Sequence, residues 1–140
     1  MPKAIDTNIL VRFLLDDGSE EVPIAHDVFR HEALEISSSV ILECEWVLRS
    51  IYKVKRDAIC EAFTAVLNLE NVLVQDENVV LAAVDAHRQG LDFADAMHLF
   101  MADKSDEFLT FDTTFRRFAN RLADALPVRV PTLHSPERKT

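Results

Sequence analysis

The sequence predicts an α/β fold in which a short, mostly parallel sheet is flanked by helices. Short apolar runs typical of buried strands alternate along the chain with segments whose apolar residues recur at helical spacing. Only 2 of the 140 residues are Gly and 5 are Pro, which favours many helices and short loops. This length suits one globular domain, and 49% hydrophobic residues suffice for a substantial core. Strands that alternate with helices usually build a parallel sheet with helices on its faces.

Five segments are predicted to be strands because each is short and apolar and is bounded by turn residues. They are residues 3–6, 33–36, 72–74, 108–110 and 128–130. The last segment lies between Pro127 and Pro131, so we expect it at an edge of the sheet.

Seven helices are predicted from helical spacing and from capping residues. In the first, Thr7 or Asn8 is expected to be the cap, and the second begins near Pro23, a suitable first-turn residue. Gly90 is expected to end the fifth because it permits positive φ. The remaining predicted helices are 38–52, 57–69, 78–89, 93–104 and 113–119. Together with the strands they form one domain, residues 1–132, followed by a polar tail, 133–140.

The formal net charge of −9 argues against broad, non-specific binding to nucleic acid, which depends on Lys and Arg. A nuclease with this balance would need divalent cations to offset its own carboxylates. No apolar run is long enough to span a bilayer, and the first residues lack the apolar segment of a signal peptide, so we expect a cytoplasmic protein. Cys44 and Cys60 are expected to be reduced core residues, with a disulfide as the alternative.

Four acidic residues follow predicted strands or open the next helix. Asp6 ends the first strand, Glu43 lies one turn into the helix after the second, Asp95 lies in the first turn of its helix, and Asp112 follows the fourth strand. Sites in open parallel sheets form outside the carboxyl ends of the strands, so these acids can converge there. Crowded carboxylates repel unless a cation intervenes, and hard oxygen ligands suit Mg²⁺ or Mn²⁺. No Cys/His spacing for structural zinc is present.

Each acid also has a purely structural interpretation. Asp6, Asp92 and Asp112 are suited to capping helices through backbone N–H bonds. Periodicity does not choose between Glu43 and Glu45, which point to nearly opposite faces of one helix, and either could face solvent.

Four blocks of the sequence resemble PIN domains, in order and spacing, and are most similar to the VapC branch of toxins. They are "AIDTNILVRFLL", "SSSVILECEWVLRS", "GLDFADAMHL" and "FLTFDTTFRRFA", and the resemblance extends from residue 3 to about residue 130. It implies a three-layer sandwich and a Mg²⁺- or Mn²⁺-dependent endoribonuclease toxin. It also implies a homodimer and a VapB antitoxin whose C-terminal segment lies across or near the active site.

The resemblance further assigns residues. Asp6, Glu43, Asp95 and Asp112 would be the metal-binding and catalytic acids, with Glu43 preferred to Glu45 because the motif places its acid between Ile-Leu and Trp-Val-Leu. Supporting polar residues would be Thr7, Asn8, Asp92 and Thr110. Many relatives carry an Asp where this chain has Thr114, which weakens a second metal position.

In the implied mechanism, metal ions held by the four acids polarise the phosphodiester and activate a water, which Glu43 holds or deprotonates. The resemblance implies products with 5′-phosphate and 3′-hydroxyl ends. Two groups of basic residues are candidates for phosphate contacts, with a solvated surface as the alternative for each: Lys53, Lys55 and Arg56, or Arg116, Arg117 and Arg121. Trp46 and the nine Phe are expected mainly in the core.

Other functions remain open at this stage. The segment Asp6-Thr7-Asn8 faintly resembles the phosphoacceptor loop of haloacid-dehalogenase-type phosphatases, although Asn8 stands where that loop has a second Asp. Rossmann and P-loop nucleotide sites are excluded because neither glycine lies in a phosphate-binding motif. The remaining alternative is a catalytically silent PIN-like module that binds RNA or protein.

Overall fold

The computed structural model describes residues 1–134, which contain seven helices and five strands in the predicted order. The helices are α1 (Thr7–Leu14), α2 (Glu21–His31), α3 (Ser38–Ser50), α4 (Arg56–Leu67), α5 (Glu77–Gln89), α6 (Phe93–Met101) and α7 (Thr113–Ala119). The strands are β1 (Lys3–Ala4), β2 (Leu34–Ile36), β3 (Val72–Val74), β4 (Phe108–Leu109) and β5 (Val128–Arg129). The predicted α/β class is confirmed. Most of the predicted tail, 135–140, lies outside the described residues.

All strand pairs in the described part of the chain are parallel, but they form two sheets instead of one. One sheet has the order β1-β2-β3, and the other contains only β4 and β5. The expectation of a single continuous sheet is therefore wrong. β1 and β4 are only two residues long, and each pairs with one strand, β1 with β2 and β4 with β5. Strands this short have few backbone groups with which to hydrogen-bond a second strand.

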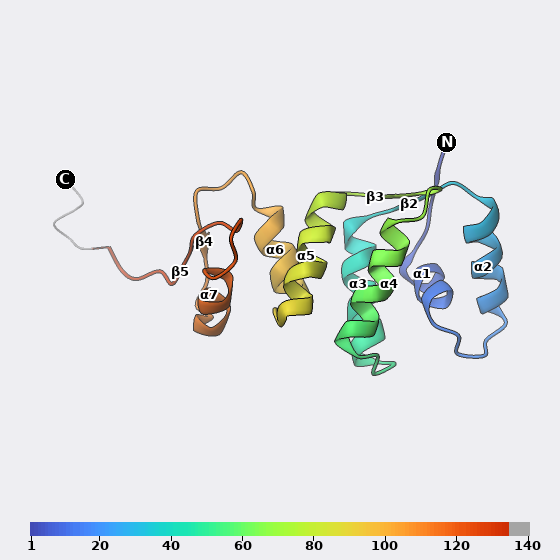
Figure 1. Cartoon of the computed structure of the whole chain (residues 1–140), viewed down its shortest axis with the longest axis horizontal. Helices are drawn as coiled ribbons and strands as arrows, with labels where there is room; N and C mark the ends of the chain where they lie inside the picture. Colours follow the sequence, from blue (N-terminus) through green and yellow to red (C-terminus); the bar gives the residue numbers. More distant parts are fainter. Residues whose placement is uncertain (135–140) are drawn as a thin grey trace.

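The helices extend the molecule along one axis. In Figure 1, α1 and α2 lie at one end with the three-stranded sheet, α3 to α6 occupy the middle, and α7 lies at the other end with β4 and β5. No helix within residues 1–134 has the length and hydrophobicity that crossing a bilayer requires.

The core is built from apolar faces of five helices. Leu10, Ile41, Phe63, Val80 and Phe93 are each at most 1% exposed. The rings of Phe63 in α4 and Phe93 in α6 lie 5.6 Å apart in a tilted contact, which ties the start of α6 to the interior. Burial of each such side chain contributes about 1.5–3 kcal/mol to folding. The N-terminus of α6 is thus fixed by packing.

Both cysteines are buried and free, as expected. Burial, and to a smaller extent the charges of Glu45 and Glu43, raise the pKa of Cys44 to about 12. The Cys44 thiol is therefore protonated at neutral pH and acts as a small apolar side chain.

Helix ends differ from the predictions in identifiable ways. The N-cap of α1 is Asp6, and not Thr7 or Asn8 as predicted. α3 ends at Ser50, two residues early, and the backbone soon leaves the helical conformation, since Lys53 has a left-handed φ of +58°. α6 ends at Met101, because the polar residues that follow provide no apolar face to bury.

Gly90 ends α5, as predicted, with φ +124°. A Cβ atom at this position would lie 3.4 Å from Cε2 of Phe118 and 3.6 Å from Nη1 of Arg56, in ordinary contact with both. We expect Gly90→Ala to lower the free energy of unfolding by about 1–2 kcal/mol, because alanine is strained at this φ. Chemical denaturation measures the loss. Gly18→Ala is the matched control: Gly18 also has positive φ, but a Cβ there would touch nothing, so this variant measures backbone strain alone. Equal free energies of unfolding for Gly90→Ala and the parent chain would contradict the prediction.

Candidate active site

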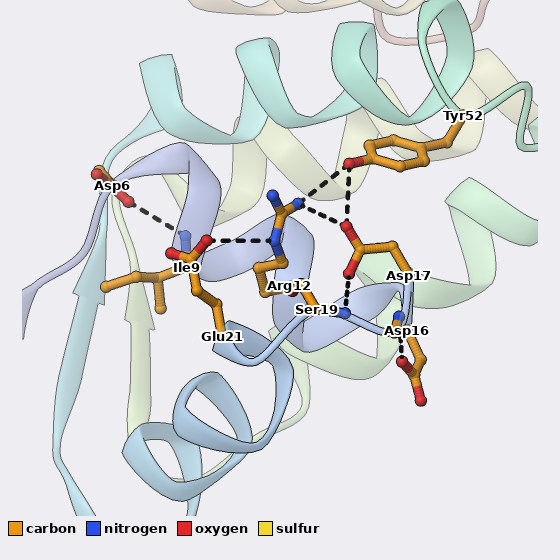
Figure 2. Close-up of polar contacts among 9 residues, drawn as sticks. Asp6, Ile9, Arg12, Asp16, Asp17, Ser19, Glu21 and Tyr52 are labelled. Atoms are coloured by element: carbon orange, nitrogen blue, oxygen red, sulfur yellow. Dashed lines mark hydrogen bonds and ion pairs between the residues drawn. The ribbon is translucent and has the colours of Figure 1, made fainter.

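Two candidate site residues lie where α1 begins. The Asp6 carboxylate accepts a hydrogen bond of 3.1 Å from the backbone N–H of Ile9 and so caps the helix (Figure 2). The next residue, Thr7, is buried and donates its hydroxyl hydrogen to the carboxylate of Glu43 in α3. This bond joins residues 36 positions apart in the sequence and fixes the Glu43 carboxylate beside the start of α1.

The other end of α1 is held by Arg12. Its Nη1 donates to the hydroxyl of Tyr52 at 3.1 Å and lies 3.5 Å from the carboxylate of Asp17, while its Nε lies 4.0 Å from Glu21 (Figure 2). The hydrogen bond with Tyr52 and the charge of Asp17 raise the pKa of Arg12. Arg12 therefore stays charged and connects the last turn of α1 to residues that flank α2 and α3. These contacts fix the position of α1, whose first residues follow Asp6.

Glu43 faces a hollow between α3 and α6. The hollow has a volume of about 310 Å³ and is lined by Ser39, Leu42, Glu43, Glu45, Trp46, Arg49 and Ala94. Ala94 directly precedes Asp95, so Glu43 opens toward the segment that carries the third candidate acid. The side chain of Trp46 is 52% exposed here, which corrects its expected place in the core.

Glu45, which also lines this hollow, is buried and paired. Its carboxylate accepts a 2.8 Å bond from Nε of Arg49, and its Oε2 lies 3.9 Å from Nε2 of His87 in α5. The other ring nitrogen of His87, Nδ1, donates to the carbonyl of Leu91 at 2.7 Å. Glu45 thus belongs to the interior network that holds the turn before α6. Sequence reasoning missed this role, although Arg49, four residues later on the same helix face, could have indicated it.

Three acids gather at the starts of α6 and α7. Asp92 caps α6 by accepting a bond from the backbone N–H of Asp95 at 3.2 Å, and Asp112 caps α7 by accepting one from Phe115 at 2.9 Å. Burial raises the pKa of Asp95, and the negative charges of Asp92 and Asp112 raise it further, against a small opposing effect of His98. The charged form of Asp95 is therefore disfavoured, first by burial and then by like charge, and a bound cation would favour it.

The structure brings the candidate residues together in two groups. Thr7 joins Glu43 at the start of α1, next to Asp6, and Asp92 and Asp112 influence Asp95. No group of three or more His, Cys, Asp or Glu within residues 1–134 is arranged to hold one metal ion. The strands that lead to Asp6 and Asp112, β1 and β4, belong to different sheets.

The remaining supporting residues have distinct places. The hydroxyl of Thr110 accepts a 3.0 Å bond from the backbone N–H of Asp112 and shapes the turn into α7. Asn8 is exposed on the outer side of α1, in a hollow of about 190 Å³ shared with α2. Thr110 is thus attached to the acidic group, whereas Asn8 faces α2.

Comparison with known proteins identifies the fold family. The family model described as "PIN domain" matches residues 3–121, which include all four candidate acids. A search of curated proteins finds no match. PIN domains are generally nucleases and typically use divalent metal ions. Since the match covers most of the sequence, the chain belongs to the PIN domain family.

Proposed function

We propose that this protein is a Mg²⁺- or Mn²⁺-dependent endoribonuclease that acts as a VapC-type toxin. The observation that carries the proposal is the PIN-domain match over residues 3–121, which includes Asp6, Glu43, Asp95 and Asp112. The similarity of the four sequence blocks to VapC toxins, and the position of Asp95 near the charges of Asp92 and Asp112, support the same function.

The donor chemistry fits a hard divalent cation. Asp6, Glu43, Asp95 and Asp112 supply only carboxylate oxygens, which Mg²⁺ and Mn²⁺ prefer. Asp95 and Asp112 would hold the ion; Asp6 and Glu43 belong to the other group in the structure, and their binding to the same ion is part of the proposal. When bound, the ion would polarise a phosphodiester oxygen and lower the pKa of a water molecule.

The residues of the chain have separate roles in this proposal. Glu43, oriented by the hydroxyl of Thr7, holds the attacking water and accepts its proton. Asp92 fixes the first turn of α6 and so places Asp95, and Thr110 does the same for Asp112. In-line attack of the water on phosphorus would leave a 5′-phosphate and a 3′-hydroxyl.

The proposed biological setting follows from the VapC resemblance. The protein would be cytoplasmic and homodimeric, and a VapB-type antitoxin would inhibit it by laying its C-terminal segment across or near the active site. The polar character of 133–140 is consistent with the proposed end of the nuclease domain near residue 132.

A test of metal dependence uses purified protein and single-stranded RNA. We expect cleavage with Mg²⁺ or Mn²⁺, a loss of at least about 100-fold in rate with excess EDTA, and recovery when Mg²⁺ is restored, because the metal contributes several kcal/mol of transition-state stabilisation. Ca²⁺, which prefers more ligands and looser geometry, is the matched control ion. Cleavage unchanged by EDTA would contradict the proposal.

A second candidate function is a catalytically silent RNA- or protein-binding module. The separation of Asp6 and Glu43 from the other acids, with no three-residue metal group in the described residues 1–134, favours this alternative. It predicts that RNA is bound in the same assay but stays intact with every metal.

A further inference from the structure

Three helices meet around Gly90 with an arginine and an aromatic ring on their facing surfaces. Arg56 opens α4, Phe118 lies in α7, and both approach Gly90 at the end of α5 within contact distance of the Cβ position. Both side chains lie within van der Waals range of the Cβ position of Gly90, so the end of α5 places them on one surface. Arg56, from the first group of phosphate-binding candidates, therefore lies near Phe118, which belongs to the segment 116–121 that carries the second group.

Two more arginines extend this region, Arg117 in α7 and Arg121 just after its end. The guanidinium of Arg121 lies 5.5 Å from the centroid of the Phe118 ring, in cation–π geometry. Nε of Arg121 also donates to the carbonyl of Arg117 at 3.3 Å. With Thr114, these residues line a hollow of about 420 Å³. We call Arg56, Arg117 and Arg121, with Phe118 and Thr114, the arginine surface.

The three arginines are not neutralised by the protein. In the part of the chain that the structure describes, neither Arg56, Arg117 nor Arg121 lies within ion-pair distance of a carboxylate. Arg49 and Arg129, in contrast, each pair with a glutamate at 2.8 Å or less. In a chain with a net charge of −9, three unpaired and exposed guanidinium groups form a local positive field that suits an external anion.

The arginine surface is connected to the acids of the candidate active site by short segments of the chain. Gly90 precedes Asp92 by two residues, and Asp112 caps α7, which contains Arg117 and is followed by Arg121. An anionic chain that is held on these arginines and follows α7 toward its first residue would therefore reach Asp112. A nucleic-acid strand, which carries one negative charge per nucleotide, can place successive phosphates on several arginines along this path.

We propose that the arginine surface binds the phosphates of the RNA strand adjacent to the cleaved bond. This proposal rests on the proposed function and extends it by naming the residues that hold the substrate. Arg121, kept against Phe118, and Arg117 contact successive phosphates, and Arg56 contacts the strand from the side of α4. Guanidinium groups are suited to this because they donate two parallel bonds to phosphate oxygens.

The test measures binding separately from cleavage. In the Asp95→Asn background, the affinity for a short fluorescein-labelled single-stranded RNA of mixed sequence is measured by fluorescence anisotropy over a series of salt concentrations. We expect Arg117→Ala with Arg121→Ala to raise Kd about tenfold at low salt and to reduce the salt slope by about 0.7 per lost contact. Arg56→Ala is expected to have a smaller effect in the same direction.

Matched variants separate the outcomes. Arg30→Ala removes an exposed charge from α2, at the other end of the molecule in Figure 1, and should leave Kd within about twofold. Arg117→Lys with Arg121→Lys should restore most of the affinity, which a folding defect would not allow. If the Arg117/Arg121 alanine variant binds RNA as tightly as Arg30→Ala does, the proposal is overturned. If that alanine variant keeps its RNA affinity but loses affinity for a labelled acidic peptide, the arginine surface binds protein and the proposal is overturned as well.

Failure of this proposal differs from failure of the proposed function. If Asp95 is intact and RNA is cut, but the alanine variants bind normally, the nuclease stands and the RNA lies elsewhere. If no RNA is cut under any condition, yet affinity falls in the alanine variants and returns with lysine, the arginine surface stands and the nuclease does not.

Discussion

Asp95→Asn is expected to abolish RNA cleavage while making the folded protein more stable. The amide removes a charge that the proposed metal site needs, so kcat/KM should fall by about 100-fold or more. The same change removes a carboxylate whose pKa is raised by burial and by the charges of Asp92 and Asp112, so the folded state loses an electrostatic penalty. Cleavage assays and urea denaturation at neutral pH measure the two effects.

The pH dependence of stability gives the sign of this penalty. Asp95 has a higher pKa in the folded protein than its ordinary value of 3.8, so the folded state binds the proton more tightly than the unfolded state. The contribution of Asp95 to the free energy of unfolding therefore decreases as pH rises from 3.8 through the folded pKa. The stability gained by Asp95→Asn should be largest at neutral pH and disappear below pH 3.8.

Asp85→Asn, the same substitution at an exposed position in α5, is the matched control and should alter neither activity nor stability appreciably. An Asp95→Asn protein that cuts RNA at the parent rate would show that Asp95 is not catalytic. One that is inactive but less stable than the parent would show that its role is structural, since the predicted gain in stability separates the two roles.

Glu45→Ala is expected to lower the free energy of unfolding by about 2–3 kcal/mol. The change deletes a side chain that is 1% exposed and leaves a cavity. It also removes the acceptor of both hydrogen bonds that the Arg49 guanidinium donates. In addition, it removes the carboxylate that lies 3.9 Å from the buried Nε2 of His87, an atom with no hydrogen-bond partner within the described residues. Since small domains are stable by about 5–15 kcal/mol, this is a large fraction of the total. Denaturation followed by the fluorescence of Trp46, the single tryptophan, measures the loss.

Two variants test the cause. Glu45→Gln preserves the volume and an acceptor for Arg49, so its cost should be about 1 kcal/mol. Glu61→Ala, at an exposed position in α4, should change stability by no more than about 0.5 kcal/mol. Equal stabilities of Glu45→Ala and Glu61→Ala would show that the interior network does not stabilise the fold.

The fold was largely predictable because its elements are marked by local patterns. The short apolar run at 72–74 predicted β3 in place, and Gly90 predicted the end of α5. The pairing of strands was not predictable, because β1 and β4 are far apart in the sequence and local patterns carry no information about which strands meet. The sequence therefore predicted one sheet where the structure has two.

The candidate site was predictable only in part. The capping alternative for Asp6, Asp92 and Asp112 is confirmed, and this does not exclude a second role as metal ligands, since each cap uses a limited part of the carboxylate. Spacing could not distinguish Glu43 from Glu45, because both faces of α3 carry apolar residues. Burial separates the two residues, since Glu45 is enclosed with Arg49 whereas Glu43 is exposed and bound to Thr7; the role of Glu43 as a site residue stays a prediction.

The most direct test of the nuclease assignment is to map RNA 5′ ends in cells after brief induction of the protein, beside cells that express Asp95→Asn at the same level. We expect new ends carrying 5′-phosphates at a restricted set of sites with the parent chain, and none of them with Asp95→Asn. Identical end maps for the two proteins, with both folded and present in equal amounts, would contradict the conclusion that this PIN domain cuts RNA.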